Sequence, residues 1–223
     1  MQINLDFQQR VVIETGRQEW IDTRANGVQR RMLDRDGAES GRATSLVRFA
    51  PESYFPDHTH DGGEEFLVLE GTFSDESGDY GPGMYVRNPI GSHHVPHTDG
   101  GCVIFVKLWQ MDPADQEYVR IDTNQDDGWR PGSVAGSSVR PLHQFGRERV
   151  SLVRWEAGVR LSGHDHPGGE EVLVLDGTLE DELGRYPAGT WLRMPPGSQH
   201  APFSGDGCTL FVKLGHLSGE VGS

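Results

Sequence analysis

Short apolar runs separated by glycine and proline are the dominant pattern of the chain. Runs rich in apolar residues cover residues 66–69, 84–87 and 102–109, and turn-forming residues lie between them. The chain has 30 glycines and 13 prolines to punctuate such runs, which have the length of β-strands. No long segment places its apolar residues at helical spacing. The pattern therefore predicts an all-β protein.

The pattern occurs twice along the chain, at a constant offset of 106 residues. The sequence Ser-Leu-Val-Arg at 45–48 returns at 151–154, and Phe-Val-Lys-Leu at 105–108 returns at 211–214. Self-similarity at a fixed period indicates an internal duplication. A chain of 223 residues is long enough for two small domains, each with its own core.

The duplication predicts two domains joined by a linker. We place the first domain at residues 1–111 and the second at residues 139–223. Residues 112–138 between them are polar and glycine-rich and have no apolar periodicity, which is typical of a linker that lies over the surface. Within residues 1–27 the apolar segment 11–13 is expected to add an edge strand to a sheet.

Acidic residues outnumber basic ones, and this limits the expected partners. The 34 acidic and 20 basic residues give a formal net charge of −14 at pH 7. Such a charge opposes binding to nucleic-acid phosphates and to anionic membrane surfaces. The N-terminal residues have no basic start followed by an apolar segment, and no run approaches the roughly 18 apolar residues of a membrane span. We therefore expect a cytoplasmic protein with no direct nucleic-acid partner and no membrane partner.

The two cysteines, Cys102 and Cys208, occupy the same position in the two copies. Each begins an apolar strand, so we expect both to be small buried hydrophobic side chains. A disulfide between them would require the two domains to present equivalent strands to each other, and a cytoplasmic setting also disfavours it.

Three histidines and one glutamate in each copy have the spacing of metal ligands. His58 and His60 are two residues apart, so on a strand both imidazoles project from one face. Two glycines before Glu64 allow a sharp turn that can return its carboxylate to the imidazoles, and His94 follows a Pro-x-Gly turn. Three imidazoles and one carboxylate suit zinc or a metal such as iron, nickel or manganese. The second copy repeats the set as His164, His166, Glu170 and His200. We expect two divalent ions per chain, with zinc favoured.

Two further pairs of residues recur beside these ligands. Glu65 and Glu171 follow the ligand glutamates directly and should point to the opposite face of the strand, where they are solvated or ion-paired. Arg87 and Arg193 lie just before the Pro-x-Gly turn that delivers the last histidine. We therefore expect Arg87 and Arg193 to be pocket residues.

The remaining polar candidates have structural interpretations. The recurring pairs Asp75-Glu76 and Asp181-Glu182 are typical of hairpin tips. His93 and His97 have no histidine counterpart in the second copy, and we expect them in a loop or at the mouth of the pocket. No Ser-His-Asp constellation, phosphate-binding loop or dinucleotide fingerprint supports a hydrolase or a nucleotide-dependent enzyme.

The histidine pattern resembles the two sequence motifs of the cupins. HxHxxxExxxxxxG is found at residues 58–71 and 164–177, and GxxxxxPxGxxH at residues 83–94 and 189–200. Because both motifs are present in both copies, the chain looks like a bicupin. The resemblance implies that each half is a small jelly-roll β-barrel. It also implies metal binding by the four residues of each copy that the spacing selects.

Within the cupins, one family is especially similar. The segment GGEEFLVLEGTFSDESGDYGPGMYVRNPIGSHHVP and the following GCVIFVKL closely resemble the cupin domain of the anti-sigma factor ChrR and its relatives. The resemblance covers roughly residues 28–109 and 139–214. ChrR-type factors grip a sigma factor with a helical zinc domain that has paired cysteines. The only cysteines here are Cys102 and Cys208, so sigma binding by that route is not expected from these residues.

The ChrR resemblance favours a regulatory function. It implies a metal-binding module that senses a small molecule or an oxidant, with sigma-factor-related regulation as an implied partnership. A four-ligand site satisfies tetrahedral zinc with no open position, which suits structure or sensing. The small-molecule partner is not identified by the sequence, and self-association into a homodimer is left open.

An enzyme is the alternative. The same ligands around iron, nickel or manganese leave two positions of an octahedron open for a substrate and dioxygen. That arrangement predicts a cupin dioxygenase of the β-diketone or flavonol-cleaving type, in which Glu64 or Glu170 could leave the metal and act as a base. A third hypothesis, with one copy structural and only the other active, is disfavoured because both ligand sets are complete.

Overall fold

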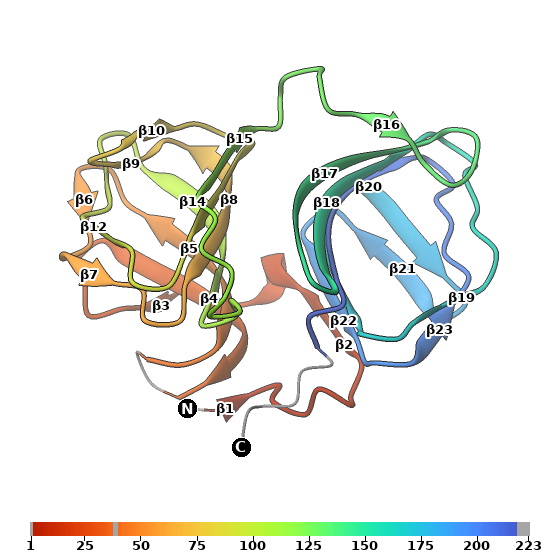
Figure 1. The fold of residues 1–223 in the computed structure, drawn as a ribbon, viewed down its shortest axis with the longest axis horizontal. Helices are drawn as coiled ribbons and strands as arrows, with labels where there is room; N and C mark the ends of the chain where they lie inside the picture. Colours follow the sequence, from red (N-terminus) through yellow and green to blue (C-terminus); the bar gives the residue numbers. More distant parts are fainter. Residues whose placement is uncertain (1, 38–39, 218–223) are drawn as a thin grey trace. The chain divides into compact units, whose positions relative to one another are not determined.

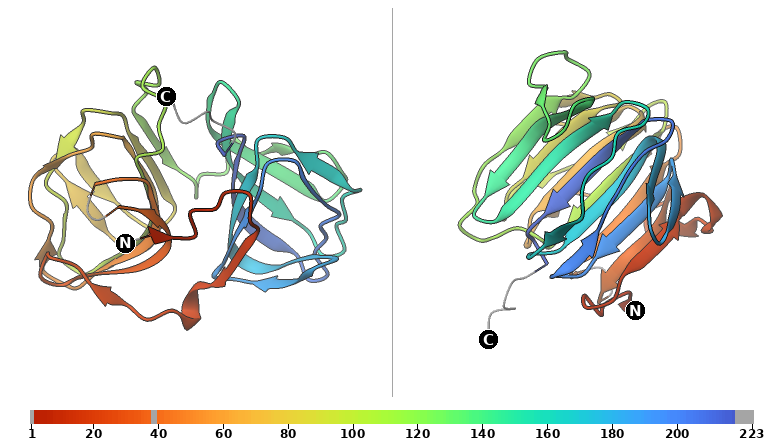
Figure 2. Two further views of the ribbon diagram at one scale, coloured as in Figure 1. Left: turned by 90° about the horizontal axis from the view of Figure 1, so that it is seen from below. Right: turned by 90° about the vertical axis from the view of Figure 1, so that its right-hand side faces the viewer.

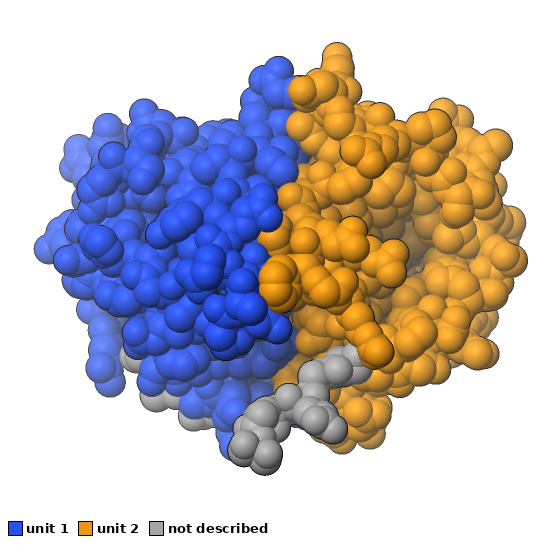
Figure 3. All heavy atoms as spheres, viewed as in Figure 1, with its two compact units in different colours: residues 1–5, 18–125 blue, residues 6–17, 126–223 orange. Residues whose placement is uncertain are grey.

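The computed structural model describes residues 2–37 and 40–217, and nearly all regular structure in them is β-strand (Figure 1). The only helical element in these residues is a short 3-10 turn, η1 (Thr15–Arg17). The all-β prediction is confirmed. The chain forms two compact units, which Figure 3 colours separately. Unit 1 comprises residues 1–5 and 18–125, and unit 2 comprises residues 6–17 and 126–223.

Unit 1 is built on an eight-stranded antiparallel sheet. Its strands are β1 (Gln2–Ile3), β3 (Ile21–Asp22), β4 (Val28–Asp36), β5 (Ala43–Phe49), β8 (Glu64–Gly71), β11 (Met84–Asn88), β14 (Cys102–Leu108) and β15 (Val119–Asp122). They lie in the order β1-β4-β5-β14-β8-β11-β15, with β3 also paired to β4. Shorter strands complete the barrel: β6 (Ser53–Tyr54), β7 (His58–Thr59), β9 (Phe73–Asp75), β10 (Gly78–Tyr80), β12 (His93–His94) and β13 (His97–Thr98). These form one sheet in the order β10-β9-β13-β6 and the separate pair β12-β7.

Unit 2 repeats this arrangement. Its strands are β2 (Val11–Glu14), β16 (Arg130–Pro131), β17 (Ser137–Phe145), β18 (Glu148–Trp155), β19 (His164–His166), β20 (Glu170–Asp181), β21 (Gly184–Pro187), β22 (Thr190–Met194), β23 (Ser198–His200) and β24 (Cys208–Leu214). The main sheet has the order β16-β17-β18-β24-β20-β22-β2, β21 pairs with β20, and β19 pairs with β23. Within each unit the strands curve round into a barrel, as the left view of Figure 2 shows.

Alternate residues of the central strands form the core of each barrel. Phe66 and Val68 on β8 pack with Ile104 and Val106 on β14, and all four are at most 5% exposed. The second barrel buries the residues 106 positions later, which are Val172, Val174, Leu210 and Val212. Period-two burial follows from the pleat, which sends successive side chains to opposite faces. Cys102 and Cys208 are buried free thiols in these cores, as predicted.

The structure divides the chain differently from the sequence-based boundaries at 1–111, 112–138 and 139–223. Residues 6–17 belong to unit 2, because β2 pairs with β22 there. Residues 112–125 belong to unit 1, because β15 pairs with β11. The expected linker therefore contains strands, whose short polar sequences give no periodic signal. The last six residues of the predicted second domain, 218–223, lie outside the described residues.

Within the described residues, no helical segment has the length and apolar character that a membrane span requires.

Candidate metal centres

The first barrel brings its four predicted ligands together through two neighbouring loops. His94 on β12 lies directly opposite His58 on β7 in an antiparallel pair. The amide of Gly91 donates to the carbonyl of His60 at 3.0 Å, which ties the Pro-x-Gly turn to the first motif. Gly63 has a φ of +75°, and this left-handed conformation makes the sharp turn that starts β8 at Glu64.

The ligand atoms of the first barrel are close enough to share one ion. His58, His60, Glu64 and His94 each offer one atom within 4.8 Å of the others. The Nε2 atoms of His60 and His94 are 3.1 Å apart, and Glu64 Oε2 is 3.3 Å from the former and 3.6 Å from the latter. Two atoms that bind one ion at about 2.1 Å cannot be separated by more than about 4.2 Å, and these three pairs satisfy that limit.

The second barrel assembles the same residues less tightly. His164, His166 and His200 form a group within 4.8 Å, which Glu170 does not join. His166 and His200 again place their Nε2 atoms 3.1 Å apart. Glu170 Oε2 lies 3.5 Å from His166 Nε2 and 3.7 Å from His200 Nε2. Its carboxylate therefore lies beside the imidazoles and needs a small shift to share an ion with all three.

Hydrogen bonds on the far ring nitrogens aim the imidazoles into each site. His58 Nδ1 is 2.9 Å from the carbonyl of Pro56, and His164 Nδ1 is 3.1 Å from that of Ser162. An Nδ1–H that donates to a carbonyl leaves Nε2 as the free lone pair, the tautomer that a metal needs.

The last histidine of each motif has an aspartate beside its Nδ1 atom. His94 Nδ1 lies 3.1 Å from Asp75 Oδ2, and the other oxygen of Asp75 accepts from the Tyr80 hydroxyl at 3.1 Å. In the second barrel His200 Nδ1 lies 3.5 Å from Asp181 Oδ2. Metal-bound imidazoles commonly donate to such a carboxylate, which fixes the ring and increases its basicity.

The two glutamates differ in their neighbours. Glu64 Oε2 accepts a hydrogen bond from Asn88 Nδ2 at 2.9 Å, and Asn88 Oδ1 in turn accepts from Arg120 at 2.6 Å. Asn88 is opposite Glu64 on β11, and the residue opposite Glu170 on β22 is Met194. Methionine donates no hydrogen bond, and Glu170 Oε2 is buried without a hydrogen-bond partner among the described residues.

These surroundings move the pKa values of the two glutamates in opposite directions. Burial pushes the pKa of Glu64 up, but the imidazoles of His60 and His94 and the Asn88 amide outweigh it, so the pKa lies below its ordinary value. Burial, reinforced by the charge of Asp181, raises the pKa of Glu170 to about 8. In the absence of metal, the first carboxylate is thus stabilised as an anion and the second is not.

The histidines are shifted as well. Burial lowers the pKa of His60, and burial together with the two neighbouring imidazoles lowers that of His166 to about 4. Burial also lowers the pKa of His200. Burial acts in the same direction on His94, but its hydrogen bond to Asp75 and the negative charges of Glu64 and Asp75 together outweigh burial and raise the pKa. Neutral imidazoles are the form that binds metal.

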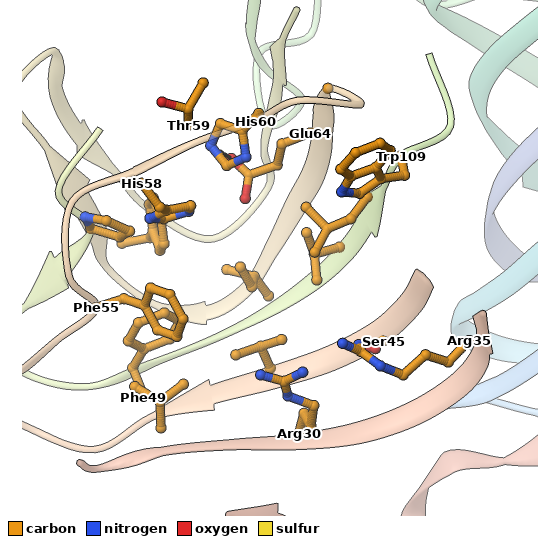
Figure 4. Close-up of a pocket in the computed structure, with 18 residues that line it drawn as sticks. Arg30, Arg35, Ser45, Phe49, Phe55, His58, Thr59, His60, Glu64 and Trp109 are labelled. Atoms are coloured by element: carbon orange, nitrogen blue, oxygen red, sulfur yellow. Dashed lines mark ion pairs between the residues drawn. The ribbon is translucent and has the colours of Figure 1, made fainter. Parts of the chain in front are cut away.

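A cavity adjoins each set of ligands. In the first barrel a cavity of about 150 Å³ is lined by His58, His60 and Glu64, and aromatic side chains such as Phe55 and Trp109 form other parts of its wall (Figure 4). In the second barrel a cavity of about 420 Å³ is lined by all four ligands. Larger residues explain the smaller first cavity: Trp109, Phe73 and Phe55 replace Gly215, Leu179 and Leu161 of the second barrel.

Arg87 and Arg193, which we expected in the pocket, do not line either cavity. Arg87 is 1% exposed and forms ion pairs with Glu65 and Asp115, at 2.5 Å each. The reason is strand phase: Arg87 pairs with Glu65, whose side chain points away from Glu64, so both lie on the other face of the sheet. The expectation for Glu65 is therefore met, and the residue that faces the ligands from β11 is Asn88.

Sequence reasoning missed Asn88 and underestimated Asp75 and Asp181. The aspartates recur at the 106-residue offset, a signal that we attributed to hairpin tips. Asn88 gave no such signal, because the second copy has Met194 at the corresponding position. His93 and His97 are exposed and do not line the first cavity.

Comparison with known proteins identifies the family. The sequence model described as the ChrR Cupin-like domain matches the chain twice, at residues 8–112 and 116–218. No curated protein matches the chain in a sequence search.

Solved structures share the fold at low sequence identity. A “putative dioxygenase” from Nostoc punctiforme aligns with a TM-score of 0.79 at 18% identity, over 96% of this chain and 85% of the other. Salicylate 1,2-dioxygenase from Pseudaminobacter salicylatoxidans aligns with a TM-score of 0.61 at 13% identity, over 78% and 70% of the two chains. The bacterial pirin YhhW from Escherichia coli, in complex with nickel(II), aligns with a TM-score of 0.63 at 12% identity, over 92% and 99%. Such identities establish the two-barrel fold and nothing finer.

Proposed function

The chain belongs to the ChrR cupin-like family, and we propose that its two barrels are divalent-metal centres that bind and transform small molecules, with dioxygenase chemistry as the reaction class. The observation that carries this proposal is the cavity beside each ligand set. A structural metal site is closed by its protein ligands, whereas a catalytic site keeps a position open toward the substrate. Here His58, His60 and Glu64 form part of a cavity wall, so a ligand in the cavity can reach the same ion.

The chain's own residues have distinct parts in this proposal. His58, His60, Glu64 and His94 hold the ion in the first barrel, and Asp75 keeps His94 in the orientation that presents Nε2. A divalent ion held there supplies Lewis-acid chemistry and, in the case of iron or manganese, redox chemistry.

The dioxygenases and the nickel-bound pirin among the structural relatives support metal chemistry on this fold by analogy only. The size of the first cavity adds a constraint of its own. At about 150 Å³ it is smaller than the ~300–1,000 Å³ of typical drug-sized ligand pockets, which favours a small substrate over a flavonol there. The second cavity, about 420 Å³, accommodates a larger molecule.

The test combines metal analysis with oxygen uptake. We expect protein purified without added metal to contain iron, nickel or manganese, measured per chain by elemental analysis. With β-diketones and flavonols as substrates, oxygen consumption should require the metal and disappear in His60→Ala and His166→Ala together. Zinc at both sites with no oxygen uptake on any substrate would contradict the dioxygenase proposal.

A regulatory module is the second candidate, and the family match favours it. In that case zinc occupies the two sites, and the same cavities bind a signal molecule or an oxidant. Ligand binding then changes the affinity for a partner protein, such as a sigma-factor regulator. The discriminating observation is a ligand that changes partner binding without being consumed.

A further inference from the structure

The strands β2 and β15 are equivalent pieces of the two sequence copies. β2 begins the segment Val-Val-Ile-Glu-Thr at residues 11–15, and β15 begins the segment Val-Arg-Ile-Asp-Thr at residues 119–123. Each strand starts three residues after the beginning of its family match, which is residue 8 in the first copy and residue 116 in the second. The internal duplication therefore includes these two strands.

Backbone pairing supports the same equivalence. Val11 on β2 lies opposite Arg193 on β22. Val119 on β15 lies opposite Arg87 on β11, and Arg87 and Arg193 are equivalent positions of the duplication. The threonine after each strand donates from both its amide and its hydroxyl group to the carbonyl of one glycine, in the pairs Thr15–Gly189 and Thr123–Gly83.

Each of these strands completes the barrel of the other copy. β2 belongs to the first copy by sequence but pairs with β22 in unit 2, and Figure 1 shows the two strands side by side. β15 belongs to the second copy by sequence but pairs with β11 in unit 1. The strands that follow them, β3 and β16, pair with β4 and β17 of their own copies. The two copies thus exchange one strand reciprocally.

Each exchanged segment brings an arginine to a buried tyrosine. Arg120 on β15 donates through Nε to the hydroxyl of Tyr80 at 3.2 Å. Arg10, which directly precedes β2, donates through Nη2 to the hydroxyl of Tyr186 at 2.5 Å. Each guanidinium group also lies 5.4 Å from the centroid of its tyrosine ring. Tyr80 and Tyr186 are at most 4% exposed, so both contacts lie within the protein.

The tyrosines connect these arginines to the aspartates beside the candidate metal sites. The hydroxyl of Tyr186 donates to Asp181 Oδ1 at 2.5 Å, and that of Tyr80 donates to Asp75 Oδ1 at 3.1 Å. The other oxygen of each aspartate faces Nδ1 of the last histidine of its motif. A tyrosine hydroxyl has one hydrogen and also accepts. An arginine that donates to its oxygen therefore leaves the hydrogen directed at the aspartate.

The two arginines come from different positions of the exchanged segments. By the strand register, Arg120 corresponds to Val12, and Arg10 corresponds to Tyr118. The duplication alone does not account for an arginine at both tyrosines, because neither arginine has an arginine at its equivalent position. Two separate positions that supply the same group indicate a requirement of the site.

From this arrangement we infer that Arg10 and Arg120 are positioning residues, each for the metal site of the copy to which it does not belong by sequence. Each holds its tyrosine and aspartate so that the last histidine keeps its proton on Nδ1 and presents Nε2 to the ion. An arginine that only fastened its strand to the barrel would not affect the imidazole. The inference rests on the proposed function for the ion, but the proton on the imidazole can be measured without metal.

Cobalt(II) binding to the full chain tests the inference one site at a time. Arg10→Met is combined with His60→Ala, so that only the second site remains, and Arg120→Met is combined with His166→Ala. Each arginine variant should weaken cobalt binding by about 2- to 10-fold, the effect of one hydrogen bond, and should change the visible spectrum of the bound ion. Arg120→Met should have the larger effect, because Arg120 also donates to Asn88. The lysine variants of both positions retain a donor and should lose less.

The exchange predicts a crossed pattern. Arg10→Met should leave the first site unchanged when it is combined with His166→Ala, although Arg10 precedes the ligands of the first copy in sequence. Arg120→Met should likewise leave the second site unchanged when it is combined with His60→Ala. The matched controls are exposed arginines near the same strands, Arg17→Ala and Arg130→Ala, which should leave both sites unchanged.

A double-mutant cycle keeps the test valid if an arginine variant melts early. Tyr186→Phe removes only the hydroxyl group and should weaken the second site by a similar factor. Adding Arg10→Met to Tyr186→Phe should then cause little further loss, because the two residues act through one hydrogen bond. Additive losses would show that the arginine does not act through the tyrosine and would overturn the inference.

Nitrogen-15 NMR of the metal-free chain supplies the reading without metal. At a pH where the imidazoles are neutral, His94 and His200 of the wild type should carry their proton on Nδ1. Arg120→Met should populate the other tautomer of His94, and Arg10→Met that of His200. Cobalt binding with unchanged affinities, spectra and tautomers in both variants refutes the inference alone, and so does an effect of Arg10→Met on the first site. A wild type that binds no cobalt but has arginine-dependent tautomers refutes the proposed function alone.

Discussion

The two candidate metal sites have the same four ligand types at the same spacing, yet they hold their glutamates differently. Glu64 accepts a hydrogen bond from Asn88, which Arg120 holds in place. Glu170 is opposite Met194, and its Oε2 has no hydrogen-bond partner among the described residues. The comparison shows that identical ligands are not enough to make two sites equal. The residues that lie opposite the glutamates, Asn88 and Met194, determine how well each glutamate is oriented and charged before an ion binds.

The site whose ligands are better oriented before the ion binds should have the higher metal affinity. A ligand that is already oriented and hydrogen-bonded loses less freedom when metal binds, and partners of the ligands commonly contribute 10- to 100-fold to metal affinity. The first barrel also has the closer aspartate, at 3.1 Å from His94 compared with 3.5 Å from His200 in the second. Both differences favour tighter binding in the first barrel.

Removing one ligand from each barrel should have the largest effect. His60→Ala and His166→Ala are each expected to lower the metal content from about two ions per chain to about one, because an imidazole ligand is lost from a four-residue shell. Elemental analysis after gel filtration measures this. The ion that remains in His60→Ala should be removed by a chelator at lower concentration than the ion that remains in His166→Ala.

The matched controls are neighbours of the last ligands. His93 precedes His94, is exposed and does not line the cavity, and Gln199 occupies the corresponding position before His200. His93→Ala and Gln199→Ala should retain both ions. Two tightly bound ions in the double variant of His60 and His166 would show that the ligands are assigned incorrectly.

Exchanging Asn88 and Met194, the residues opposite the two glutamates, should have the next largest effect on metal binding. Asn88→Met removes the hydrogen bond to Glu64 and should weaken metal binding in the first barrel by about 10- to 100-fold. Met194→Asn places an amide opposite Glu170 and should strengthen the second site. A competition titration with a chromophoric chelator measures each affinity, with Met194→Leu as the apolar control. No change in either exchange would refute the account of the difference.

A smaller effect is expected from the aspartates behind the last histidines. Asp75→Asn keeps the shape of the side chain but removes the charge that orients His94, and should weaken the first site by about tenfold. Asp181→Asn should have less effect on the second site, because His200 Nδ1 is 3.5 Å from Asp181. Asp75→Asn is measured together with His166→Ala, and Asp181→Asn together with His60→Ala. In each case only one metal site remains, so the measured affinity belongs to that site. A larger loss from Asp181→Asn would reverse this ranking.

The fold and the clustering of the candidate ligands could be predicted from the sequence because their signals are local. His58, His60 and Glu64 lie within seven residues, and the duplication supplied an internal check on each of them. The all-β class followed from short apolar runs, which decide the local conformation. Such signals need no knowledge of which strands become neighbours.

The rest depends on pairings between distant segments. Arg120, which holds Asn88, lies in a segment whose polar composition predicted a linker, and its strand is defined only by pairing with β11. Arg87 was placed on the wrong side of its strand, because the Pro-x-Gly turn does not reveal which residue before it faces the cavity. A shift of one residue exchanges the faces of a strand completely, so Asn88 and not Arg87 reaches Glu64.

The buried thiols should have the smallest effect, because at neutral pH their ionisation does not change the free energy of unfolding. Burial raises the pKa of Cys102 to about 12 despite a hydrogen bond with Thr98, and burial also raises the pKa of Cys208. The folded state thus keeps a proton that the unfolded state loses above its ordinary pKa, so these thiols leave stability unchanged at pH 7. Stability should fall as the pH rises above about 9, by at most ~1.4 kcal/mol per pH unit for each thiol, and the fall due to Cys102 should continue to about pH 12. Denaturant unfolding of wild type and Cys102→Ala across this range measures the slope, and the variant should decline less steeply. Equal slopes, or rapid labelling of either thiol in the native state at pH 8, would contradict the burial of these thiols in the two cores.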